Sequence, residues 1–356
     1  MSQIKTDQPQ VTREEDSLDE SKVLNYLKQE MAGIENVESI EILQFPGGAS
    51  NLTYQVAFGD QTMILRTAPR GANIKGAHDM GREFNVLSRL QGHFPYCPKP
   101  IAYSDDETIL GRPFYLMEKV EGLIPRREMP VELNPEENRV LCENLISIHT
   151  DLHAVDISKT GLIELGKPEG YVSRQVSGWC GRYEKARTED VPKGSTVMKW
   201  LMDNQPDDSY NTAAQASFIH NDYKFDNVVL DSNNSTEIIS VLDWEMATVG
   251  DPLMDLGCSM AYWIEAKDSD EMHMIRMMPT HLEGMMTRDQ VVDYYIQKSG
   301  RNIANFNYYY VFGMFRLAVI AQQIYKRYKE GKTSNKKFAI LGKFCSILLL
   351  ECKKYL

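Results

Sequence analysis

The stretch His220-Asn-Asp222-Tyr-Lys224-Phe-Asp-Asn227 decides how the rest of this 356-residue chain is interpreted. It has the form H-x-D-x-x-x-x-N, and two short apolar runs follow it, the second ending at Asp243. Short apolar runs separated by polar residues indicate strands joined by a turn. A hairpin at this point would fold Asn227 and Asp243 back to one place.

These residue types suit phosphoryl transfer. That reaction needs a carboxylate beside the attacking hydroxyl and oxygen ligands for the magnesium ion that neutralises the phosphates. Asp222 supplies the first, Asn227 and Asp243 supply the second, and Lys224 could reach the transferring phosphate as a point charge. The alternative is a loop rich in Asp and Asn that only caps turns. The complete string favours the chemical interpretation, with ATP and Mg²⁺ as ligands.

The chain before this stretch is rich in strand signals. Apolar residues alternate over 52–58, and a Gly-Asp turn leads into another run at 61–67, a pattern typical of half-buried strands. Further strands are predicted over 38–45 and 113–120, with a helix over 78–90 between them. Residues 1–16 are predicted to be a disordered tail, and Ser17 to Glu20 a capping box that starts a helix.

The chain after Gly122 has a mainly helical pattern. Asn134 and Pro135 suit the start of a helix, and a compact β segment over 217–243 interrupts the later helices. Those helices are predicted over 172–187, 195–204, 252–264, 288–299, 306–330 and 338–350. We therefore predict an α+β, two-lobed kinase-like fold, with a nucleotide-binding lobe over 17–120 and a helical lobe with the catalytic loop and acceptor site over 121–356. ATP and Mg²⁺ would bind between the lobes.

Composition excludes several other classes of protein. Hydrophobic and charged fractions of 42% and 25% are those of a globular chain. A net charge of −11 disfavours nucleic acid as a partner. Six scattered cysteines without a C-x-x-C pair argue against zinc and disulfides. With no signal peptide and no apolar run long enough for a membrane, a cytoplasmic location is predicted.

Two segments resemble a known family. The stretches F-I-H-N-D-Y-K-F-D-N-V-V-L-D and V-L-D-W-E-M-A-T-V-G-D-P-L-M-D-L-G are similar to the aminoglycoside phosphotransferase family, in particular to the kinase-like domain attached to some acyl-CoA dehydrogenases. The likeness extends over about 45–262. It implies transfer of the γ-phosphoryl group of ATP to a hydroxyl of a small molecule. It also implies a structural role for Asp251 and Asp255, which resemble residues that cap a helix and brace the catalytic loop.

The resemblance assigns residues to the nucleotide as well. F-P-G-G-A-S-N-L-T-Y is similar to the glycine loop of this branch, which implies that Gly47, Gly48, Ser50 and Asn51 lie over the phosphates. The G-x-G-x-x-G spacing is absent, and an ordinary hairpin turn explains the segment equally well.

Arg66 occupies the place where kinases usually have a phosphate-binding Lys. The resemblance implies that its guanidinium bridges phosphate oxygens and pairs with Glu83, although two unrelated surface charges are the alternative. Met117, Glu118 and Lys119 would form the hinge that reads adenine.

Other residues carry weaker signals. His149 and His153 have the spacing of two zinc ligands on a helix, but the sequence suggests no third ligand, so we interpret them as structural. Aromatic residues such as Trp179 and Tyr262 would line an acceptor pocket or belong to the core.

Two functional hypotheses remain from the sequence. A protein-kinase activation segment ending in A-P-E is missing after Asp243, which favours a small hydroxyl acceptor over a protein. The rival hypothesis is a nucleotide-binding module with little catalysis and a regulatory or partner-binding role, which Arg66 in place of Lys would favour. Amino alcohols, sugars, aminoglycosides and hydroxyacyl compounds all stay open as acceptors, and so does the oligomeric state.

Overall fold

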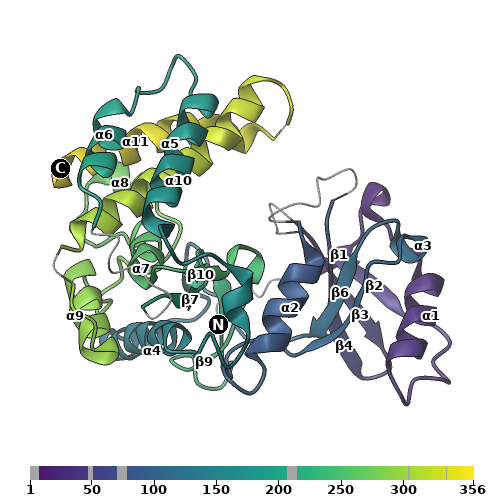
Figure 1. Ribbon diagram of the computed structural model, residues 1–356. Helices are drawn as coiled ribbons and strands as arrows, with labels where there is room; N and C mark the ends of the chain where they lie inside the picture. The colour runs from purple at the N-terminus through teal and green to yellow at the C-terminus, as the bar shows by residue number, and fades with distance from the viewer. Residues whose placement is uncertain (1–7, 47–50, 70–77, 207–214, 304, 334) are drawn as a thin grey trace. The chain divides into compact units, whose positions relative to one another are not determined.

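The computed structural model describes residues 8–46, 51–69, 78–206, 215–303, 305–333 and 335–356 (Figure 1). The chain divides into two compact units. The first holds residues 1–124 and 228–246, and the second holds residues 125–227 and 247–356. The sequence analysis set the lobe boundary at Val120 and counted the hairpin at 228–246 with the helical lobe, whereas here the hairpin groups with the first unit.

The first unit is built on a six-stranded antiparallel sheet with the order β1-β2-β3-β4-β6-β5. Its strands are β1 (Gln10–Val11), β2 (Glu41–Gln44), β3 (Leu52–Phe58), β4 (Gln61–Thr67), β5 (Pro100–Ser104) and β6 (Phe114–Glu118). β3 and β4 pair along their whole length across the predicted Gly-Asp turn. The strands expected at 38–45, 52–58, 61–67 and 113–120 are confirmed, and β1 and β5 were not predicted.

The start of the described chain is more ordered than the sequence suggested. β1 pairs with β2, a 3-10 helix covers Glu14–Asp16, and the Tyr54 hydroxyl donates to the Asp16 carbonyl at 2.7 Å. The expectation of disorder was therefore wrong for residues 10–16. Helix α1 (Glu20–Glu30) begins after Asp19, whose side chain accepts from the Lys22 amide, instead of at the capping box expected from Ser17.

The two faces of this sheet differ in chemistry because side chains alternate along a strand. Leu65 of β4 packs with Tyr54 and with α1 in the apolar core of the unit. Its neighbour Arg66 must point to the opposite face, where it meets Glu83 of α2 (Met80–Leu90). The alternation that fills the core thus also places a charged pair beneath α2.

The remaining elements of the first unit are a short helix and a second hairpin. They are α3 (Glu107–Leu110), β8 (Val228–Leu230), β9 (Ile238–Val241) and the 3-10 helix Trp244–Met246. The predicted hairpin is present, because β8 pairs with β9 in antiparallel fashion.

The second unit is mainly helical, as predicted. Its longer helices are α4 (Pro135–His153), α5 (Tyr171–Ala186), α6 (Ser195–Asp203), α7 (Pro252–Met260), α8 (Asp270–Met274), α9 (Arg288–Ser299), α10 (Asn307–Lys329) and α11 (Leu341–Cys352). β7 (Ser217–Ile219) pairs with β10 (Thr248–Gly250). Asn134 makes a full capping box with Glu137 ahead of Pro135. In the described part of the chain, no helix is long and apolar enough to cross a membrane.

Helices α7 and α10 cross at two glycines. A Cβ on Gly313 would meet the Gly257 carbonyl oxygen at 2.1 Å, and one on Gly257 would meet the Tyr309 carbonyl oxygen at 2.2 Å. Only glycine permits backbones to approach this closely. This crossing fixes which residues of α10 face the C-terminal half of α7.

We expect Gly257→Ala to destabilise the protein by about 1–3 kcal/mol or more, because the added methyl group cannot be accommodated without moving backbone. The free energy of unfolding in denaturant measures this. Gly181→Ala is the matched control, since Gly181 lies within α5 with no atom within 4 Å of an added Cβ. There the higher helix propensity of Ala should stabilise by up to about 1 kcal/mol. Equal effects of the two substitutions would contradict the close crossing.

Candidate active site

The Asp222 carboxylate lies at the centre of a group of donors in the second unit. Lys224 Nζ lies 2.7 Å from its Oδ2 and Asn227 Nδ2 lies 3.0 Å from the same oxygen. The Tyr262 hydroxyl, at 3.3 Å, donates to Oδ1. The preceding residue, Asn221, has a left-handed φ of 65°, a conformation that non-glycine residues adopt at a cost. Asp222, Lys224 and Asn227 are therefore brought together, as the sequence predicted.

Lys224 is a buried cation held between an acid and an aromatic ring. Its ammonium lies 4.7 Å from the centre of the Tyr262 ring. Burial opposes the charged form, but Tyr262 and the Asp222 carboxylate outweigh it and raise the pKa of Lys224 above its usual value. The side chain is thus a fixed positive charge beside Asp222.

The amide nitrogen of Asn227 donates hydrogen bonds within this loop. Nδ2 donates to the Asp222 carbonyl at 2.8 Å as well as to its carboxylate. The amide oxygen is the end of the side chain that these bonds do not use. An amide oxygen is a suitable ligand for a hard cation.

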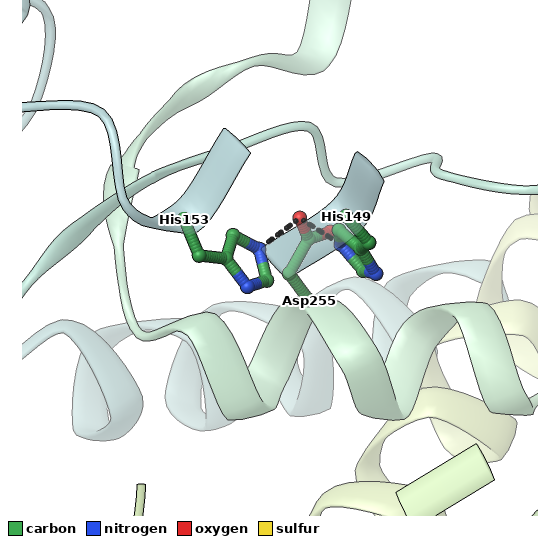
Figure 2. A group of neighbouring side chains, drawn as sticks. All are labelled: His149, His153 and Asp255. Carbon is green, nitrogen blue, oxygen red and sulfur yellow. Dashed lines mark hydrogen bonds and ion pairs between the residues drawn. The ribbon is translucent and has the colours of Figure 1, made fainter. Parts of the chain in front are cut away.

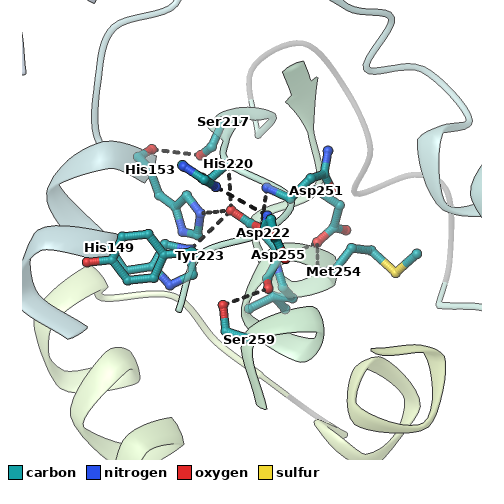
Figure 3. Close-up of polar contacts among 12 residues, drawn as sticks. His149, His153, Ser217, His220, Asp222, Tyr223, Asp251, Met254, Asp255 and Ser259 are labelled. Atoms are coloured by element: carbon teal, nitrogen blue, oxygen red, sulfur yellow. Dashed lines mark hydrogen bonds and ion pairs between the residues drawn. The ribbon is translucent and has the colours of Figure 1, made fainter. Parts of the chain in front are cut away.

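Asp255 of α7 holds the catalytic loop by hydrogen bonds to its backbone. Its carboxylate accepts from the backbone N–H of His220 at 2.8 Å and of Asn221 at 2.7 Å. It also lies 3.1 Å from His149 Nε2 and 3.2 Å from His153 Nε2. Figure 2 shows both imidazoles of α4 pointing toward this carboxylate, and Figure 3 shows its bonds to the loop. The bracing role that the resemblance implied is confirmed.

The structure adds a third group to the histidine pair. The sequence suggested no third ligand for His149 and His153, yet Asp255 lies beside both, and the three are fully buried. Burial first, and then His149, lower the pKa of His153 to about 3 against the pull of Asp255, so its imidazole is neutral. Because Asp255 Oδ2 lies at hydrogen-bond distance from two imidazole nitrogens and a backbone N–H, a hydrogen-bonded brace accounts for the cluster.

Asp251 acts as the predicted helix cap. Its side chain accepts from the amides of Leu253 and Met254 at the start of α7. Asp251 therefore fixes the start of the helix that carries Asp255 (Figure 3).

Asp243 lies in the first unit, in a second strained position with a φ of 69°. Arg66 Nη2 lies 3.1 Å from Asp243 Oδ1, and Arg66 Nη1 lies 2.6 Å from Glu83 Oε1. Glu245 is a third acid, at 3.8 Å from the guanidinium. Burial opposes the charge of Arg66, but Glu83 and the other acids raise its pKa well above the usual value. The predicted Arg66–Glu83 ion pair is present, and it extends to the predicted metal ligand.

Asn51 joins the same network from the predicted glycine loop. Its Nδ2 donates to Glu245 Oε2 at 2.6 Å, and its Oδ1 lies 2.9 Å from His78 Nδ1. Gly47, Gly48 and Ser50, the other residues assigned to that loop, lie outside the described residues. Sequence reasoning missed Glu245. Its position two residues after Asp243 could have indicated a second carboxylate near the predicted metal ligand.

The predicted hinge residues lie at the C-terminal end of β6 and directly after it. Met117 is buried and pairs with Ile64 of β4. Glu118 is exposed, and its side chain accepts from the Lys99 amide at 2.9 Å. Lys119 pairs with Glu121 at 2.6 Å. These contacts hold the segment against β5.

The fold and the loop together define a class of protein. An antiparallel sheet joined to a helical part that carries H-x-D-x-x-x-x-N, then a hairpin and an Asp, is the kinase-like fold of phosphotransferases. Residues 41–279 match the model of the phosphotransferase enzyme family. The chain belongs to that family.

Several known proteins are similar to this chain. Acyl-CoA dehydrogenase family member 11 of Homo sapiens is 32% identical over 315 residues, which is 87% of this chain and 39% of that protein. Member 10 of Mus musculus is 31% identical and is covered to 28% of its length. The chain thus spans about two fifths or less of these relatives.

Solved structures agree with the fold. A putative aminoglycoside phosphotransferase from Ralstonia eutropha JMP134 superposes with a TM-score of 0.80 at 28% identity, covering 95% of this chain and 98% of that one. Choline kinase from Cryptosporidium parvum shares the fold alone, with a TM-score of 0.64 at 13% identity, covering 94% of this chain and 95% of that one.

Replacing Asp255 should destabilise the second unit strongly. We expect Asp255→Ala to lower the free energy of unfolding by about 3–5 kcal/mol, because it leaves four buried nitrogens without their acceptor. Thermal denaturation measures this. Asp203→Ala is the control, since Asp203 forms an exposed pair with Lys199 worth at most about 1 kcal/mol. A small effect at Asp255 would show that the brace is dispensable.

Acidification from pH 7 to pH 5 should weaken the fold through His153. The folded pKa of His153, about 3, lies below the unfolded value of 6.5, so the unfolded state binds more protons below pH 6.5. The contribution of neutral His153 to the free energy of unfolding is fully present above that pH. It decreases as the pH falls, by about 2 kcal/mol at pH 5. The melting temperature between pH 7 and 5 measures it. His153→Gln should flatten the profile, and an unchanged slope would contradict the neutral imidazole.

Proposed function

We propose that this protein is an ATP-dependent phosphotransferase that moves the γ-phosphoryl group to a hydroxyl of a small molecule. Asp222 takes the proton of the attacking hydroxyl. The acceptor oxygen then forms its bond to the γ-phosphorus while the bond from that phosphorus to the β–γ bridging oxygen breaks, and ADP leaves. The reaction needs no covalent enzyme intermediate.

The observation that carries this proposal is the setting of Asp222. Three donors hold its carboxylate, from Lys224, Asn227 and Tyr262, and the brace at Asp255 holds the backbone just before it. A base works when its position is fixed beside the proton that it accepts. A residue that merely caps a turn does not need this many restraints on its side chain and backbone.

The oxygen donors suit Mg²⁺. The Asn227 amide oxygen and the Asp243 carboxylate are of the kind that this ion prefers. The hairpin register supports their joint use, because Val228, the residue after Asn227, pairs with Val241, two residues before Asp243. The bound ion would neutralise charge on the phosphate oxygens, while Lys224 adds a fixed cation beside the transferring group.

Arg66, Glu83 and Asn51 are proposed to serve the nucleotide. Arg66 is pre-oriented by Glu83, and its fork of N–H donors suits phosphate oxygens. Asn51 would contribute together with Gly47, Gly48 and Ser50, and Met117 to Lys119 would read the base. One relative in fold, an aminoglycoside phosphotransferase 14% identical with a TM-score of 0.58, was solved with AMP-PNP and hygromycin B. That supports ATP as the donor here.

The rival proposal, a nucleotide-binding module with little catalysis, has one observation in its favour. Arg66 stands where a Lys is usual and is already engaged by three carboxylates. Thermal shifts with ATP, with and without Mg²⁺, combined with a panel of hydroxyl acceptors, separate the two. Nucleotide binding without turnover on any acceptor would favour the module.

Asp222→Asn should lower acceptor-dependent ADP formation by about 10²- to 10⁴-fold, because the amide cannot take the proton. ATP binding, followed by thermal shift, should persist. Asp226→Asn is the matched control four residues further on, since Asp226 pairs instead with Arg126 at 2.6 Å. Full turnover in Asp222→Asn would remove the proposed base.

A further inference from the structure

Arg316 is a cation buried within the second unit, close to the proposed base. It lies on α10, one turn beyond the crossing at Gly313, and only 6% of it is exposed. The crossing turns it toward the C-terminal end of α7. Arg316 hydrogen-bonds Cys258 of that helix, and it is close enough to Tyr262, Asp222 and Tyr171 for their charges to raise its pKa.

Two of these neighbours contact the catalytic loop directly. The Tyr262 hydroxyl donates to the Asp222 carboxylate, and the Tyr171 hydroxyl donates to Asn221 Oδ1 at 3.4 Å. Arg316 of α10 thus interacts electrostatically with both tyrosines that touch the loop, and it contacts Trp179 of α5 and Cys258 of α7 directly. Lys224 reaches Asp222 as well, through its ion pair at 2.7 Å.

Arg316 forms no ion pair within the described part of the chain. Among the residues that the structure describes, its guanidinium has no carboxylate within 4.0 Å. Burial opposes its charge, yet Cys258, Tyr262 and Asp222 keep its pKa above the usual value, so it stays protonated. Asp222, the acid whose charge acts on Arg316, already pairs with Lys224. A buried cation without its own anion is costly, and an anionic ligand would offset that cost.

Trp179 of α5, which contacts Arg316, has a polar group that no described residue satisfies. Its ring centre lies 5.3 Å from the Arg316 guanidinium carbon, and it is 7% exposed. Its buried indole N–H has no acceptor among the described residues. Arg182 covers the ring as well, at 4.5 Å, but Arg182 is exposed.

We propose that Arg316 binds an anionic group, a carboxylate or a phosphate, on the hydroxyl compound that receives the phosphoryl group. This inference rests on the proposed function and names the chemical class of its acceptor. A guanidinium suits both anions because its parallel N–H donors match their paired oxygens. The acceptor hydroxyl would then be directed to Asp222 by a charge pair at the other end of the molecule.

The proposal is tested with matched acceptors on the full chain. ADP formation with ATP and Mg²⁺ is measured for β-hydroxybutyrate against its methyl ester, and for glycerol phosphate against glycerol. We expect wild-type kcat/KM to favour at least one anion over its neutral partner by about 10- to 100-fold, the strength of a charge-assisted hydrogen bond. The two pairs distinguish a carboxylate from a phosphate.

Arg316→Met should abolish this preference by raising KM for the anion about 10- to 100-fold, with the neutral acceptor changed less than about threefold. Arg316→Lys should keep part of the preference, which covers the case in which the Met variant fails to fold. Arg182→Met, which removes the exposed cation on the same tryptophan, should match the wild type.

Equal losses for anionic and neutral acceptors in Arg316→Met would overturn the proposal, because Arg316 would then act only by positioning Asp222. A wild type without preference for either anion would overturn it too. Thermal shift by the same anions without ATP keeps the test separate from catalysis. Binding that disappears in Arg316→Met, in a protein that turns over no acceptor, would sustain the anion site while the proposed phosphotransfer fails.

Discussion

One buried carboxylate, Asp255, holds the part of the molecule on which the chemistry depends. Two consecutive backbone N–H groups, of His220 and Asn221, bind its two oxygens, which fixes the peptide between them. That restraint matters because Asn221 is left-handed, a conformation that persists only where its surroundings enforce it. The cost of burying the charge is offset by the imidazoles of His149 and His153, which donate from α4. Asp222, the next residue, therefore starts from a fixed point.

The first unit restrains Asp243 by a comparable combination of strain and charge. Asp243 is left-handed as well, and the residue after it, Trp244, is buried against Phe94 with its indole N–H on the Val241 carbonyl. Arg66 then draws the carboxylate to one side. The two non-glycine residues with positive φ in the described part of the chain, Asn221 and Asp243, thus both belong to segments proposed for catalysis. Strain of this kind survives where it positions a functional group.

How far the sequence could predict this site depended on the distance between partners along the chain. Asp222, Lys224 and Asn227 are local, so their grouping followed from spacing. Arg66 with Glu83, and the roles of Asp251 and Asp255, followed only from family resemblance. The pairing of His149 and His153 with Asp255 joins residues about a hundred positions apart, and a helix-face pattern cannot identify such a partner. β1 and β5 were missed because two residues, or a Pro-led five, carry too little alternation to be recognised.

Local charge, more than net charge or family membership, bears on the choice of acceptor. The chain carries a net −11, which would favour a cationic compound, but surface charges are screened within about 10 Å in salt. Buried charges next to the base are screened far less. There Lys224 balances Asp222, and Arg316 adds a positive charge that no described acid pairs with. A kinase-like fold serves many substrates, so the family leaves the acceptor open. The proposed role of Arg316 would restrict it, because a cationic acceptor would have to approach a like charge in a medium of low dielectric constant.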